Sequence, residues 1–206
     1  MRSSKHPATA ADKTAEIALF PLSAVLYPGG PLALRIFEPR YIDMVRRCMR
    51  DEAPFGVVLI LSGAEAGGEV ESTAAVGTSA RIADFYTLPE GLLGLSCLGM
   101  RKFRLLRRSR RADGLNVGEV AWLPDEPGVG LPAEYLHLGR LIVKVLPELG
   151  ALYDAVERRA DEAAWVGYRL AEILPVSLSE KQEWLELDDP LERLALLSPL
   201  VRREED

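Results

Sequence analysis

Residues 20–41 read FPLSAVLYPGGPLALRIFEPRY, and this stretch decides how the chain begins to fold. Two apolar runs flank the break Pro28–Pro31, where glycine permits positive φ angles and proline fixes φ. The pattern predicts a strand, a sharp turn and a second strand. Glu38 and Pro39 then favour a helix start, because proline suits the first helical position and a carboxylate suits the positive end of the helix dipole.

Most strand signals lie within residues 16–124. Short apolar or alternating runs occupy residues 55–61, 74–88, 92–108 and 116–123, and turns containing glycine or proline separate them. Many short strands in series favour a closed or half-closed barrel over a sheet of alternating strands and helices. The helix after Pro39 is expected to bury one apolar face, made of Tyr41, Met44, Val45, Cys48 and Met49.

The remainder of the chain has a helical pattern. Residues 125–132 are rich in proline and glycine and are read as a linker, and residues 133–206 are expected to form a helical bundle. Ser179 is expected to open a capping box, and Asp189 a second one followed by proline. The predicted fold class is therefore α+β, a β-rich pseudo-barrel followed by a helical bundle. Residues 1–15 are polar and are expected to be a disordered tail.

Composition places the chain among ordinary globular proteins. It has 206 residues, of which 48% are hydrophobic and 27% charged, and a net charge of -6 that arises mainly in residues 133–206. No secretory signal or apolar run long enough for a membrane span is visible, so a cytoplasmic location is expected. Cys48 and Cys97 lie in apolar patterns typical of buried free thiols, although the sequence leaves a disulfide between them open.

Catalytic patterns are weak. The segment GLSCLG at residues 94–99 is similar to a nucleophile elbow, but Leu98 stands where the elbow needs glycine. Neither Ser96 nor Cys97 has a histidine placed to activate it, although a small hydrolase using one of them remains an alternative. There is no phosphate-binding loop, and two cysteines and two histidines are too widely spaced for a metal site. The chain is therefore expected to be non-enzymatic and to need no cofactor or metal.

One segment, residues 101–111, concentrates positive charge. Only Phe103 interrupts it with an aromatic ring, so a stacking platform for bases is not evident. Basic side chains also protect an exposed strand from pairing with other chains, or face a protein partner. An RNA-binding barrel is the alternative interpretation, and nucleic acid is the less favoured partner. The residues of this possible patch are Arg101, Lys102, Arg104, Arg107 and Arg108.

Several short motifs, taken in order, resemble one protein family. They are LFPL at 19–22, YPGG at 27–30, RIFEPRY at 35–41, VGTSARI at 76–82, GMRKFRL at 99–105 and DDPLERL at 188–194. Together they resemble the N-terminal, substrate-binding domain of the Lon protease family, above all the stand-alone bacterial proteins made of that domain without the ATPase and protease modules. A more distant similarity is to the related domain of cereblon.

The resemblance implies a PUA-like pseudo-barrel joined to a helical bundle. It also implies binding of unfolded or damaged polypeptide segments and an adaptor role in protein quality control. Such a segment would lie in an apolar cleft between barrel and bundle, or add a strand to an exposed sheet edge. Whether the chain forms a homodimer is left open. The candidate contact residues are aromatic or arginine side chains near turns and strand ends, with core packing as the alternative role: Tyr27, Phe37, Arg40, Tyr41, Phe85 and Tyr86.

Overall fold

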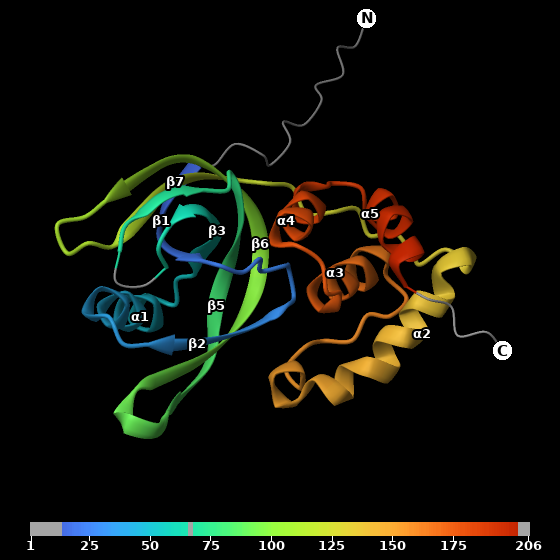
Figure 1. Cartoon of the computed structure of the whole chain (residues 1–206), viewed down its shortest axis with the longest axis horizontal. Helices are drawn as coiled ribbons and strands as arrows, with labels where there is room; N and C mark the ends of the chain where they lie inside the picture. The colour runs from blue at the N-terminus through green and yellow to red at the C-terminus, as the bar shows by residue number, and fades with distance from the viewer. Residues whose placement is uncertain (1–13, 66–67, 202–206) are drawn as a thin grey trace, which may run out of the picture.

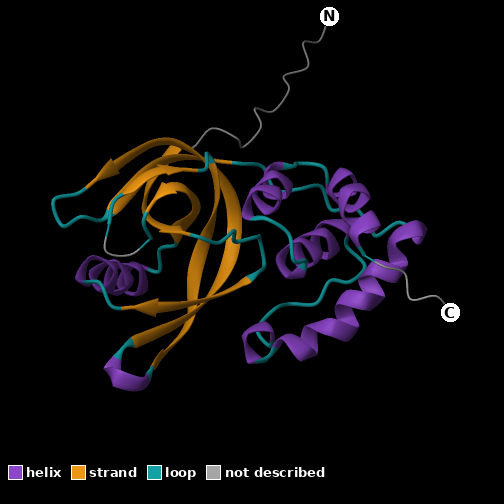
Figure 2. Cartoon of the chain, viewed as in Figure 1, coloured by secondary structure: helices purple, strands orange, loops and turns teal. Residues whose placement is uncertain are grey.

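The computed structural model describes residues 14–65 and 68–201. Strands gather on one side of the molecule and four of the α-helices on the other (Figures 1 and 2). The strands are β1 (Thr14–Leu22), β2 (Pro31–Ile36), β3 (Phe55–Gly63), β4 (Val70–Thr73), β5 (Val76–Thr87), β6 (Leu93–Arg110) and β7 (Asn116–Trp122). The α-helices are α1 (Pro39–Asp51), α2 (Leu136–Val145), α3 (Ala163–Ile173), α4 (Leu178–Glu186) and α5 (Pro190–Leu197).

The sheet closes on itself. Strand β1 pairs antiparallel with β7 on one edge and parallel with β3 on the other, and the ring runs β1, β7, β6, β5, β3 and back to β1. Closure satisfies the backbone groups that an open sheet leaves at its edges. The predicted α+β fold, with a barrel followed by helices, is confirmed.

Strand β6 organises this barrel because it is 18 residues long and pairs with two different strands along one of its edges. Its first part, Leu93–Leu98, pairs with β2, and its last part, Phe103–Arg110, pairs with β7. Strand β5 follows the opposite edge from Leu93 to Arg104. The far end of the β5–β6 hairpin projects beyond the barrel (Figure 1).

The predicted turn between the first two strands is tied directly to β6. Gly29 adopts a φ of 69°, a conformation that favours glycine. Its N–H donates to the carbonyl of Gly99 at 2.8 Å, and the N–H of Gly99 donates to the carbonyl of Gly30 at 2.8 Å. Gly99 is also crowded, since a Cβ there would lie 2.1 Å from the carbonyl oxygen of Tyr27. The turn can approach β6 this closely only because position 99 has no side chain.

The interior of the barrel is apolar, and α1 closes one side of it. Met44 and its neighbours on the predicted face are buried, but Met49 is 43% exposed and faces outward instead. Cys48 and Cys97 are both buried and both free thiols. Burial raises the pKa of the Cys97 thiol to about 12, so it stays protonated and unreactive at neutral pH.

A second apolar cluster lies among the helices and includes two residues from the barrel, Tyr27 and Val76. The helix starts follow the sequence signals with two corrections. Ser177, rather than Ser179, forms the capping box of α4 with Glu180, so the box begins two residues earlier. Asp189 caps α5 by accepting from the N–H of Leu191 at 2.8 Å, but the expected capping box is not formed, because the structure shows no return bond from Glu192 to the Asp189 N–H.

The expected tail, residues 1–15, lies largely outside the described residues. Its last two residues, Thr14 and Ala15, already belong to β1, where they pair with Ala121 and Val120. Among the described helices, none has both the length and the apolarity that crossing a membrane requires.

Replacing Gly99 with alanine is expected to destabilise the protein by about 1–3 kcal/mol, because the new methyl group must displace the Tyr27 carbonyl and with it the turn. Urea unfolding measures this loss. Gly128→Ala is the matched control, since a Cβ at that position meets nothing within 4 Å. Equal stability of the two variants would contradict the anchoring of the turn on β6.

Candidate functional site

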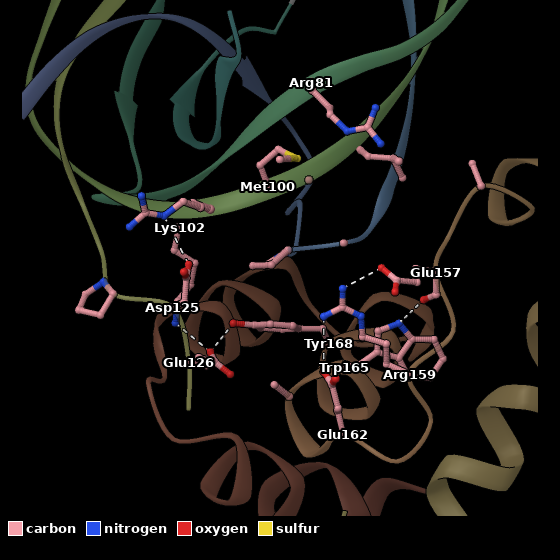
Figure 3. Close-up of a pocket in the computed structure, with 18 residues that line it drawn as sticks. Arg81, Met100, Lys102, Asp125, Glu126, Glu157, Arg159, Glu162, Trp165 and Tyr168 are labelled. Carbon is pink, nitrogen blue, oxygen red and sulfur yellow. Dashed lines mark hydrogen bonds and ion pairs between the residues drawn. The ribbon is translucent and has the colours of Figure 1, made fainter. Parts of the chain in front are cut away.

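A cleft of about 500 Å³ lies between the barrel and the helices. One wall comes from β5 and β6, and the other from α3 and the segment before it (Figure 3). Pro28 and Gly29, of the turn that is anchored on β6, also line the cleft. The strand–turn–strand unit at the start of the chain therefore helps to shape this cleft.

Apolar side chains face the cleft from both walls. Met100 of β6 lines the cleft and is 45% exposed, so its apolar side chain is accessible there. Trp165 and Tyr168 of α3 lie across from it, and both are largely buried (Figure 3). The indole of Trp165 donates to the carbonyl of Glu157 at 2.7 Å, which fixes the orientation of its ring.

Charges of both signs surround these apolar groups. Arg101 lies 3.4 Å from Asp125, measured from Nε to Oδ1. On the opposite side, Arg159 pairs with Glu157 at 2.7 Å and with Glu162 at 3.7 Å. These pairs are largely exposed to solvent and contribute little to stability. The rim therefore offers hydrogen-bond donors and acceptors without a single dominant charge.

Beneath one end of the cleft, Lys102 is buried, with a side chain only 3% exposed. Its ammonium contacts the Glu126 carboxylate at 3.0 Å and Asp188 at 3.2 Å, and it donates to the carbonyls of Leu185 and Leu187 at 3.2 and 2.8 Å. A barrel side chain thus satisfies carbonyl groups at the end of α4.

Arg193 of α5 approaches the same carboxylate from the helical side. Its Nη1 and Nη2 donate to the two oxygens of Glu126 at 2.8 and 2.5 Å, and its Nε donates to the carbonyl of Trp184 at 2.8 Å. The guanidinium lies 4.2 Å from the centre of the Tyr168 ring, and the Tyr168 hydroxyl also donates to Glu126. Glu126 is therefore shared by two buried cations from opposite sides of the interface.

A second buried ion pair, between Arg169 and Glu172, supports the turn that lines the cleft. Arg169 of α3 donates through Nη2 to the carbonyl of Pro28 at 3.0 Å and to Glu172 at 2.6 Å. Gly30 makes room for this pair, because a Cβ there would lie 1.8 Å from Oε1 of Glu172. Burial raises the pKa of Glu172 to about 7, although Arg169 and Lys181 favour its ionised form.

The six expected contact residues separate into two groups in the structure. Tyr27 and Tyr41 are buried and are not surface residues: Tyr27 donates to the Lys181 carbonyl at 2.7 Å, and Tyr41 stacks on Phe20 with ring centres 4.0 Å apart. Arg40 lies at the start of α1, paired with Glu38 at 2.6 Å. The rings of Tyr27 and Tyr41 drew attention in the sequence as possible contact residues, but in the structure they pack in the core.

The other three residues surround the end of the β5–β6 hairpin and are exposed. Phe37 is 54% exposed directly after β2, whose last residue pairs with Leu93 of β6. Phe85 and Tyr86 are 55% and 41% exposed on β5. Residues 81–87 of β5 pair only with β6 among the described strands, so their second edge is free. Core packing is therefore not the role of Phe37.

The basic strand does not form one continuous surface patch. Lys102, expected in that patch, is instead buried in the interface. Arg108 donates to the carbonyls of Val70 and Glu71 at 2.9 and 2.7 Å and so holds β4. Arg104 and Arg107 are exposed, and Arg101 lies at the cleft. The alternation of a strand places these side chains on different faces.

Glu126 is the important residue that the sequence pattern missed. It lies in residues 125–132, which were expected to be a linker, yet its side chain is only 5% exposed. Glu126 stands between Asp125 and Pro127, a local pattern that gives no sign of burial. The available signal was indirect, because a buried lysine or arginine requires a partner of opposite charge. No three His, Cys, Asp or Glu side chains within residues 14–65 and 68–201 come together to hold a metal.

Comparison with known proteins gives a consistent result. A family model described as the ATP-dependent protease La (LON) substrate-binding domain matches residues 16–203. The crystal structure of a Lon N-terminal domain protein from Xanthomonas campestris is similar at a TM-score of 0.75 and 39% identity, covering 91% of this chain and 99% of that one. The N-terminal domain of a Mycobacterium avium complex Lon protease has a TM-score of 0.63 at 15% identity, covering 90% of this chain and 97% of that one, and shows the fold alone.

The chain is also similar to curated proteins that are named Lon proteases. Lon protease of Anaeromyxobacter dehalogenans is 24% identical over 95% of this chain, and Lon protease 2 of Myxococcus xanthus is 25% identical over 92%. In both cases the match covers 24% of the relative, so the chain spans about a quarter of the length of these proteins.

The raised pKa of Glu172 has a consequence for stability. Between about pH 4.5 and 7 the folded state holds a proton that the unfolded state has lost, so the free energy of unfolding falls as pH rises through this window. The change in pKa corresponds to on the order of 3 kcal/mol, and the effect levels off above about pH 7. Glu172→Gln is expected to remove this contribution from urea-unfolding curves measured across pH 4–8. Exposed Glu183→Gln is the control, and a Glu172→Gln curve parallel to the unmodified protein would show that the assignment is wrong.

Proposed function

Because this chain belongs to the family of ATP-dependent protease La (LON) substrate-binding domains, we propose that it binds polypeptide segments in the cleft between barrel and helices and catalyses no reaction on them. The family assignment supports a substrate-binding role. That the substrate is an unfolded or damaged polypeptide, and that the protein acts as an adaptor in cytoplasmic quality control, are parts of this proposal.

The observation that carries the proposal is the composition of the cleft. Its apolar surface, which includes the exposed Met100 and part of Trp165, can accept apolar side chains of many shapes. Methionine is especially suited to this because its side chain is flexible and polarisable. The mixed charges of the rim can bond to a backbone or to polar side chains without selecting one sequence. These properties favour a segment chosen for its exposed apolar residues rather than for a particular motif.

The free edge of β5 supplies a second contact for the same segment. Arg81 lines the cleft and is also the first residue of the part of β5 that pairs only with β6 among the described strands. An extended peptide leaving the cleft here can add a strand to this edge. Phe85 and Tyr86 lie farther along the same edge, and because they are consecutive they would contact peptide side chains on opposite faces of the added strand.

Met100→Asp is expected to weaken polypeptide binding by about tenfold, because it removes an apolar contact and places a charge that must be desolvated. The measurement is fluorescence anisotropy of a labelled, reduced and carboxymethylated lactalbumin, which cannot refold. Met49→Asp is the matched control, since Met49 is 43% exposed against 45% for Met100 but lies on α1, away from the cleft. Equal weakening in both variants would rule out the cleft as the binding surface, and no binding by the unmodified protein would rule out the function.

A further inference from the structure

Three arginines meet at the end of the barrel that faces away from the cleft, around a pocket of about 250 Å³. Arg40 comes from the start of α1, and Arg108 and Arg110 come from the end of β6. Figure 1 places α1 on the side of the barrel opposite the four other α-helices. No residue lines both this pocket and the cleft.

Two of these guanidinium groups lie close together despite their like charge. Arg40 Nη1 and Arg110 Nε both donate to the carbonyl oxygen of Gly114, at 3.1 and 3.4 Å. Gly114 adopts a φ of 84° in the turn between β6 and β7, which brings its carbonyl within reach of both. A neutral carbonyl satisfies hydrogen bonds but does not balance two positive charges. The arrangement therefore favours a negatively charged group nearby.

Hydrogen-bonding capacity remains on two of the arginines that line the pocket. Arg40 Nε and Arg108 Nη1 are buried N–H donors that have no hydrogen-bond partner among the described residues. Buried donors in folded proteins are nearly always paired, so two unpaired donors beside one pocket point to a ligand with oxygen acceptors. The guanidinium group of Arg108 is held in place beside the pocket, because its Nη2 donates to the carbonyls of Val70 and Glu71.

A carboxylate of the chain already lies at the mouth of this pocket. Glu69 lines it and pairs with Arg110, yet the Glu69 side chain is 77% exposed. Glu38 balances part of the charge of Arg40. Among the described residues that line the pocket, three are arginines and one, Glu69, is a carboxylate, so the lining carries a net positive charge. Glu69 can leave at little cost, since exposed ion pairs contribute little to stability.

We propose that Arg40, Arg108 and Arg110 form a binding pocket for one oxyanion group, the chemistry that carboxylates and phosphates share. The pocket volume suits a single such group rather than a nucleic-acid strand, which needs a groove that follows its backbone. Glu69 acts as an internal competitor that the ligand displaces from Arg110. The proposal does not depend on polypeptide binding in the cleft.

The test follows the arginine Nε–H signals of the ¹⁵N-labelled full chain by NMR at constant ionic strength. One arm titrates inorganic phosphate, and a second titrates N-acetyl-glutamate amide, with N-acetyl-glutamine amide as its neutral counterpart. A saturable shift of the Arg40 Nε–H signal with phosphate, with the glutamate compound or with both is expected, and the arms show which source binds. Absence of saturation in both arms, or an equal response to the glutamine compound, would overturn the proposal.

Variants separate this pocket from general charge effects. Arg110→Gln is expected to weaken oxyanion binding roughly tenfold, whereas Arg107→Gln, an exposed arginine on the same strand outside the pocket, should leave it unchanged. Glu69→Gln is expected to tighten binding roughly threefold by removing the competitor, and Glu71→Gln, which removes the same charge nearby, should not. Equal effects within either pair would mean that ions merely screen the surface, and the pocket would be excluded.

Discussion

A single carboxylate governs how the two parts of this molecule meet. Glu126 lies between Lys102 of the barrel and Arg193 of the helices, and all three side chains are almost fully buried. Buried charges are costly unless they are paired and fully hydrogen-bonded, and this group satisfies that condition with backbone carbonyls from the end of α4. Because hydrogen bonds depend on both distance and direction, these bonds can all form in only one relative placement of barrel and helices. The cleft consequently has a defined shape.

The same interface explains why the first turn of the chain matters to the last helices. The turn is bonded to Gly99 on one side and to Arg169 on the other, so it touches strand and helix at once. The glycines of the turn do more than permit its backbone conformation. Gly30 has no side chain, and Glu172 fills the space that a side chain there would occupy. The barrel and the helices therefore share one polar layer as well as an apolar one.

Local patterns in the sequence were enough for most of the elements and for the barrel, although β4 lay outside every predicted strand. The alternation and turn signals placed the strands, and Pro39 and Asp189 marked helix starts, because these depend on neighbouring residues. Long-range contacts were beyond such patterns. Tyr27 and Lys102 looked like surface groups because polar atoms suggest exposure, yet each reaches a carbonyl of a helix far away in the sequence. Met49 fitted the apolar spacing of α1, but it lies just outside the buried face of that helix.

Strand β6 carries the exposed hairpin at one end, the cleft in its middle and the arginine pocket at the other end. Neighbouring residues of a strand point to opposite faces of the sheet. A one-residue insertion therefore moves every side chain beyond the insertion to the opposite face. An irregularity of register already lies between Leu105 and Arg107, after the cleft residues and before the pocket. The irregularity thus lets the faces on which Arg108 and Arg110 lie be set independently of those on which Met100 and Lys102 lie. An insertion at this irregularity would therefore turn the arginines to the opposite face while leaving Met100 and Lys102 in place.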